Sequence, residues 1–124
     1  MKVSFNKREP VYVQVVRHFK EQIATGSFNP GQEIPSRREL ANQLKINPNT
    51  AQRAYKEMED AGLIYTEGNN PSKIARDEKV IKAVREELIV QAVDSFVTSI
   101  RPINVPIDEL IGLIKDKYKE SADE

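Results

Sequence analysis

The chain has 124 residues, enough for one ordinary domain or a small domain with an appendage, and this length excludes a large multidomain enzyme. Apolar residues make up 39% and charged residues 31%, so the chain can bury a core and keep a polar surface. It has no cysteine, which excludes disulfide bonds, thiolate nucleophiles and zinc sites with cysteine ligands.

No part of the sequence is apolar for long enough to span a membrane. The longest aliphatic runs, such as residues 88–90, are only a few residues, whereas a spanning helix needs roughly 20. Residues 1–6 do not lead into the apolar region of a signal peptide. We therefore expect a cytoplasmic protein without a membrane segment.

Charge is distributed unevenly, although 19 basic and 19 acidic side chains cancel overall. Residues 1–76 hold 12 basic and 8 acidic side chains, a net charge of +4, whereas residues 77–124 hold 7 and 11, a net charge of −4. The zero total argues weakly against a nucleic-acid partner. The split indicates two parts with different tasks.

Three short helices are predicted in the first part. Apolar side chains recur at helical spacing over residues 11–25. A second helix starts after Ser36, because a serine followed three residues later by Glu39 forms a capping box before an apolar run. A third starts after Asn47, a good N-cap residue followed by proline, and runs to about Ala61.

The second and third helices are predicted to form a helix-turn-helix, because only residues 45–47 separate them. Strand-forming residues follow at 63–66 and 73–75, with turn formers between them. This pattern predicts a small β-hairpin, or wing. Asparagine tolerates the left-handed conformation, so we expect Asn69 to turn its tip.

Two helices are predicted in residues 77–124. The first carries apolar residues on more than one stripe until Arg101 and Pro102 stop it, and the second opens near Val105 and ends in frayed residues at 121–124. Two such helices cannot bury their aliphatic surface against each other alone, so we expect pairing with a second copy. The residues assigned to this dimerization surface are Val84, Leu88, Ala92 and Phe96.

The predicted fold is therefore mostly α with a small β-wing. Residues 1–76 form an N-terminal winged helix-turn-helix, and residues 77–124 form a two-helix C-terminal dimerization appendage. A small-ligand pocket around Phe96 is an alternative use of part of the apolar surface.

The third helix carries polar side chains suited to reading DNA bases. Recognition helices enter the major groove through their N-terminal turns. Arginine can bond guanine through two hydrogen bonds, amides can bond adenine, and threonine can contact thymine. The candidate reading residues are Asn49, Thr50, Gln52 and Arg53.

Three further cations are candidates for contacts with DNA phosphates. Arg37 and Arg38 lie in the first turn of the second helix, where backbone amides can also hold a phosphate. Lys73 lies in the wing and can contact the DNA backbone. The simpler interpretation of Arg37, Arg38 and Arg53 is that they are ordinary solvated helix arginines.

Residue types needed for catalysis are scarce. His18 is the only histidine, and there is no phosphate-cradling glycine cluster. The acidic cluster at Glu57, Glu59 and Asp60 is explained by a solvated helix face near Lys56. We therefore expect no enzyme activity, no metal site and no cofactor.

Several ordered motifs resemble the winged helix-turn-helix of the GntR family of bacterial transcription regulators. The motifs lie at residues 10–15, 30–41, 47–55 and 62–64, and the resemblance covers roughly residues 8–75. It implies a DNA contact for Arg38 and places Arg37 at a variable position. The base-reading positions that it implies are Asn49, Thr50, Gln52 and Arg53. The wing departs from the commonest family pattern, because both glycines of a Gly-x-Gly motif are missing.

The 48 residues after Arg76 resemble the helical appendage of the small, YtrA-type members of that family. The resemblance implies a regulator, expected to be a repressor, that binds an inverted-repeat operator in double-stranded DNA as a homodimer. The alternative is a winged helix that binds another protein without specific DNA binding; a strong salt dependence would favour DNA. Whether a small-molecule effector binds is left open.

Overall fold

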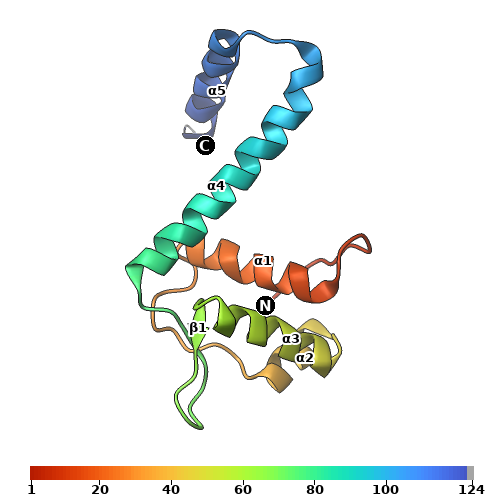
Figure 1. Cartoon of the computed structure of the whole chain (residues 1–124), viewed down its shortest axis with the longest axis vertical. Coiled ribbons are helices and arrows are strands. Elements are labelled where there is room, and N and C mark those ends of the chain that lie inside the picture. The colour runs from red at the N-terminus through yellow and green to blue at the C-terminus, as the bar shows by residue number, and fades with distance from the viewer. Residues whose placement is uncertain (123–124) are drawn as a thin grey trace. The chain divides into compact units, whose positions relative to one another are not determined.

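The computed structural model describes residues 1–122 (Figure 1). The elements are α1 (Val11–Ala24), α2 (Arg37–Leu44), α3 (Pro48–Asp60), β1 (Ile64–Tyr65), β2 (Lys73–Ile74), α4 (Glu78–Ile100), a 3₁₀ turn (Arg101–Ile103) and α5 (Ile107–Ala122). The predicted fold class is confirmed. Helix α5 extends through residues 121 and 122; the fraying expected at the chain end stays a prediction, and residues 123 and 124 lie outside the described residues.

Local hydrogen bonds start α2 and α3 where the sequence predicts. The Ser36 hydroxyl accepts from the Glu39 amide at 3.1 Å, and the Glu39 carboxylate accepts from the Ser36 amide at 3.2 Å. The Asn47 side-chain oxygen accepts from the Asn49 amide at 2.8 Å, and Pro48 is the first helical residue. Both helices therefore satisfy amides that would otherwise lack partners at a helix N-terminus.

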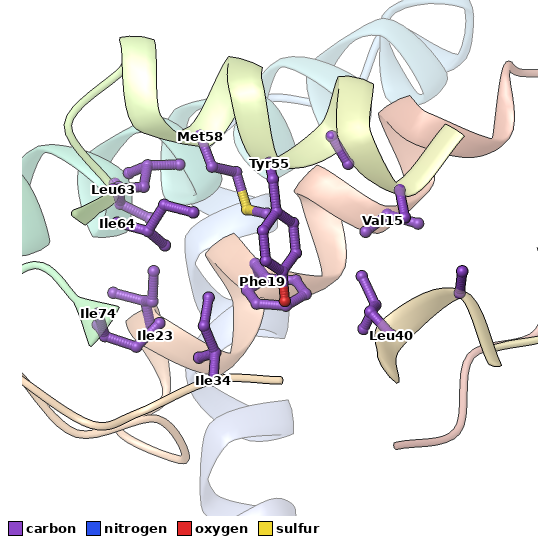
Figure 2. Packing of buried hydrophobic residues seen from close by; sticks show 14 residues of the cluster. Val15, Phe19, Ile23, Ile34, Leu40, Tyr55, Met58, Leu63, Ile64 and Ile74 are labelled. Atoms are coloured by element: carbon purple, nitrogen blue, oxygen red, sulfur yellow. The ribbon is translucent and has the colours of Figure 1, made fainter. Parts of the chain in front are cut away.

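The core of the winged unit centres on Phe19 of α1 and Tyr55 of α3, both fully buried (Figure 2). Their rings meet edge to face, with centroids 6.1 Å apart. The Tyr55 hydroxyl donates to the Pro35 carbonyl, and burial raises the pKa of that hydroxyl. Tyr55 therefore ties α3 to the segment that leads into α2. Other buried members of the cluster are Val15, Ile23, Ile34, Leu40, Ala41, Ala51, Ala54, Met58, Leu63, Ile64, Ile74 and Val84.

The wing is an antiparallel hairpin in which Ile64 pairs with Ile74. The segment before α2 joins it, because the Ile74 amide donates to the Gln32 carbonyl at 2.9 Å. The left-handed residue in the turn is Gly68, with φ +58°, and Asn69 has no positive φ. The Asn70 amide donates to the Glu67 carbonyl at 3.0 Å, so Gly68 and Asn69 are the central residues of the turn. Gly68, and not Asn69, takes the left-handed conformation there, which a glycine adopts without a steric penalty.

Gly31 combines a left-handed backbone, φ +76°, with a close neighbour. A Cβ at this position would lie 2.7 Å from Nε of Arg76, which donates a hydrogen bond to the Tyr65 hydroxyl at 2.9 Å. Gly31→Ala should lower the free energy of unfolding in urea by about 1–2 kcal/mol from backbone strain. The new methyl group should also displace Arg76 from its hydrogen bond with Tyr65, which should lower the free energy of unfolding by about another 0.5–1.5 kcal/mol.

Gly26→Ala is the matched control for this prediction. Gly26 has φ +79°, but no atom lies within 4 Å of the Cβ position, so this variant should show backbone strain alone. In an Arg76→Ala background, the two glycine substitutions should lower the free energy of unfolding by the same amount. A larger cost for Gly31→Ala in that background would contradict the role given to Arg76.

The chain divides into two compact units, one of residues 1–89 and one that begins at Val90. The first turns of α4 belong to the winged unit, where Val84 is 4% exposed in the core and Leu88 is half-buried against it. Lys20 of α1 and Glu87 of α4 form an ion pair at 3.0 Å. Val84 therefore lies inside its own protomer, which corrects its assignment to a surface between copies.

The second unit contains the last turns of α4 and the whole of α5. Leu110 is its buried apolar residue, at 8% exposure, while Ala92 and Phe96 are exposed. Among the helices of residues 1–122, none has the length and apolar character that crossing a membrane requires. The roles assigned to residues 1–76 and 77–124 stay predictions. The boundary between the two compact units lies further along the chain, at Val90.

Candidate nucleic-acid interface

The first turns of α3 present most of the predicted reading residues to solvent. Asn49, Gln52 and Arg53 are exposed and Thr50 is half-buried, while the alanines at 51 and 54 are buried in the core. The helix therefore separates a packed face from a polar face. Amide and guanidinium groups on that polar face can donate to and accept from base edges.

The arginines at the start of α2 have different surroundings. Arg38 is exposed and forms no ion pair with any residue of the described chain. Arg37 forms an ion pair with Glu59 of α3, and its guanidinium carbon lies 5.1 Å from the centroid of the Tyr55 ring. Its Nε atom is buried without a hydrogen-bond partner. Arg37 thus connects α2 to α3 within the protein.

Sequence reasoning missed the partner of Arg37. It placed the acidic cluster on a solvated face near Lys56, and Lys56 does pair with Asp60 at 3.6 Å, but Glu59 turns to Arg37. The Arg37–Glu59 pair joins residues 22 positions apart, so no spacing rule within one helix could have predicted it.

Arg53 is stacked on an aromatic ring from another helix. Its guanidinium carbon lies 3.9 Å from the centroid of the Tyr12 ring, on the first turn of α1.

Gln14, two residues further along α1, is buried. Its side chain accepts from the Asn6 amide at 3.0 Å and donates to the carbonyls of Asn6 and Glu9 at 3.1 and 2.9 Å. The sequence pattern placed Tyr12 only on the apolar face of the first helix and gave Gln14 no role, although both lie in one of the quoted motifs.

An open cleft of about 570 Å³ separates the start of α2 from the wing. Ser36 and Arg37 line it on one side, and Asn70 and Ser72 line it on the other. Lys73, in β2, is half-buried and pairs across the hairpin with Tyr65. Within residues 1–122, no group of three or more acidic or histidine side chains is placed to hold a metal ion.

His18 lies half-buried on α1, where burial lowers the pKa of its imidazole. The shift favours the neutral ring near neutral pH, since desolvation disfavours the charged form. His18 therefore adds no fixed positive charge to the winged unit.

The sequence of this chain matches a known family and several of its members. The family described as "Bacterial regulatory proteins, gntR family" matches residues 11–74. The uncharacterized HTH-type transcriptional regulator YhcF of Bacillus subtilis is 30% identical over 111 residues, which cover 90% of this chain and 92% of YhcF. The HTH-type transcriptional repressor YtrA of the same organism is 36% identical over 92 residues, covering 67% of this chain and 71% of YtrA.

Solved structures agree with these relatives. A GntR family transcriptional regulator from Listeria monocytogenes superposes with a TM-score of 0.83 at 29% identity, covering 90% of this chain and 98% of that one. AraR(DBD) in complex with operator ORX1 has a TM-score of 0.52 at 25% identity, covering 60% of this chain and 92% of that one. Both the sequence and the fold thus match a family of transcription regulators, not of enzymes. This chain belongs to that family and is a GntR-family DNA-binding transcription regulator that resembles the small YtrA-type members.

Proposed function

We propose that this protein is a cytoplasmic repressor that binds an inverted-repeat operator as a homodimer and reads base pairs through α3. The observation that carries this proposal is the contrast among the helix-turn-helix arginines. Glu59 neutralises Arg37, whereas Arg38 and Arg53 keep their charge free of any ion pair in the described chain. Two uncompensated guanidinium groups on neighbouring helices suit a polyanionic ligand.

The proposal gives the candidate residues different roles. Arg38 and Lys73 contact phosphates, while the polar face of α3 reads bases. Arg37 holds α2 against α3 and is no longer assigned to DNA, because Glu59 neutralises its charge through one terminal nitrogen and Tyr55 lies against its guanidinium. The residues assigned to base reading are Asn49, Thr50, Gln52 and Arg53.

Repression is proposed from the relative YtrA, which is described as a transcriptional repressor. A bound dimer can block transcription without any catalytic group of its own. Repression is tested by placing the selected operator before a reporter gene. Reporter output should fall when the protein is expressed, and a rise would identify an activator.

Dimerization is proposed from the apolar surface of the second unit. Val93 and Phe96 of α4 and Ile111 and Leu113 of α5 are all 40% or more exposed. Large apolar side chains exposed in this number are unfavourable in water, and a second copy would cover them with matching side chains. Ala92 and Phe96 stay in the proposed interface, whereas Val84 and the half-buried Leu88 pack within the winged unit.

A cavity of about 250 Å³ beside Phe96 belongs to the same surface. Its other lining residues include Ile100, Leu110 and Ile114, with few polar groups to orient a ligand. We assign it to the contact with a second copy rather than to a small-molecule effector. A metabolite that raised the melting temperature of the dimer would reverse this assignment.

The central experiment selects bound fragments from a pool of random-sequence duplexes at several salt concentrations. A regulator that contacts phosphates through several cations should enrich one inverted repeat, and its affinity should fall steeply as salt rises. No enriched sequence, together with salt-independent binding of a protein partner, would favour the alternative of a protein-interaction module.

Arg38→Ala tests the phosphate role separately. Because a phosphate contact carries little sequence information, this variant should weaken binding to selected and random duplexes alike and reduce the salt slope by about one. Arg85→Ala removes an exposed arginine from α4 and is the control. A loss of base preference in Arg38→Ala at an unchanged salt slope would make Arg38 a base reader instead.

A further inference from the structure

Two arginines of the winged unit stack on tyrosines, but only one of them is neutralised. Arg37 lies over Tyr55 at 5.1 Å and also pairs with Glu59. Arg53 lies closer to its ring, 3.9 Å from the Tyr12 centroid, and forms no ion pair among residues 1–122. The tyrosine thus covers one face of Arg53, while no carboxylate occupies its N–H groups.

Tyr12 is itself firmly held. Its ring is half-buried against the core of the winged unit, and α1 packs along α3. The buried amide of Gln14 fixes the segment that leads into α1 through its bonds to Asn6 and Glu9. A ring anchored in this way has little freedom to follow the motion of an exposed side chain.

We propose that Tyr12 is a positioning residue for base recognition and that it acts through Arg53. An unsupported arginine loses much of its rotamer freedom when its planar fork engages a base edge. Stacking on a fixed ring removes part of that freedom before DNA arrives, so less is lost on binding. This inference rests on the proposed reading role of Arg53.

The test measures binding to the duplex that the wild-type protein selects and to single-base variants of it. Tyr12→Leu should lower affinity for the selected duplex by about two- to fivefold. It should relax preference at the same base pair as Arg53→Ala. Tyr12→Phe keeps the ring face and should preserve both affinity and preference. Equal weakening of all duplexes by Tyr12→Leu would overturn the inference.

A double-mutant cycle decides whether Tyr12 acts through Arg53. In an Arg53→Ala background, Tyr12→Leu should cause no further loss of affinity, whereas a separate contact or a general structural role would add its full effect. If Arg53→Ala relaxes the preference at one base pair and Tyr12→Leu does not, the inference about Tyr12 fails while the reading role of Arg53 stands. If Arg53→Ala changes nothing, the reading role fails and the inference fails with it.

The stacking itself can be measured in the wild-type protein, where the result does not depend on the folding of a variant. In the free wild-type protein, the ring current of Tyr12 should shift the Arg53 side-chain proton resonances upfield, as recorded by NMR. Tyr12→Phe should keep that shift. Resonances at ordinary positions in the free protein would show that Arg53 is not stacked before binding and would overturn the inference.

Discussion

Replacing Phe96 with aspartate should convert the dimer to monomers and lower operator affinity by about 100-fold or more. Phe96 is 40% exposed on the last turns of α4, and Ala92 lies one turn before it on the same face. A carboxylate placed in an apolar interface would be desolvated without a partner. Each monomer would then hold one half-site and lose the gain from linked binding. Ala92→Asp should act in the same direction with less disturbance of the monomer.

Sedimentation equilibrium at micromolar concentration measures the mass, and titration of the selected duplex measures affinity. Thr98→Asp is the control, because Thr98 is an exposed polar residue of the same helix. This variant should remain dimeric and bind normally. A dimer that survives both Phe96→Asp and Ala92→Asp would place the interface elsewhere and remove the second unit from the proposal.

Arg53→Ala should cost about 1–3 kcal/mol of binding free energy at the selected duplex, or about 5- to 150-fold in affinity. The reason is that a guanidinium making two hydrogen bonds to one base cannot be replaced by water or by a neighbouring side chain. The preference for that base pair should disappear, while affinity for random duplexes should fall much less.

Lys56→Ala is the matched control for Arg53→Ala. Lys56 is exposed on the same helix and its ammonium already pairs with Asp60, so its removal should change affinity little. Competition between the selected duplex and its single-base variants provides the readout. Equal loss of affinity for every duplex would make Arg53 a phosphate contact and leave base reading to Asn49, Thr50 and Gln52.

Features that depend on neighbouring residues could be predicted from the sequence. Ser36 and Glu39 bond each other's amides, and Asn47 with Pro48 starts α3, because capping chemistry acts within one turn of chain. The polar face of α3 is also a local feature, because helical periodicity alone separates the buried alanines from the exposed amides.

Features that depend on distant residues could not be predicted. Val84, Leu88, Ala92 and Phe96 follow one another at intervals of four residues along α4, so the sequence does not distinguish among them. Only the tertiary fold shows that Val84 is buried in the winged unit and Phe96 is not. Likewise, no local rule pairs Arg37 with Glu59.

Helix α4 contributes side chains to the core of the winged unit before it reaches the apolar surface of the second unit. A recombination event that exchanged the C-terminal part at residue 76 would remove Val80, Val84 and Leu88 and uncover the apolar residues that they cover. Exchange is far less damaging beyond Ile89, where the compact winged unit ends. The evolutionary module that can be transplanted to a new C-terminal partner therefore includes the first three turns of α4.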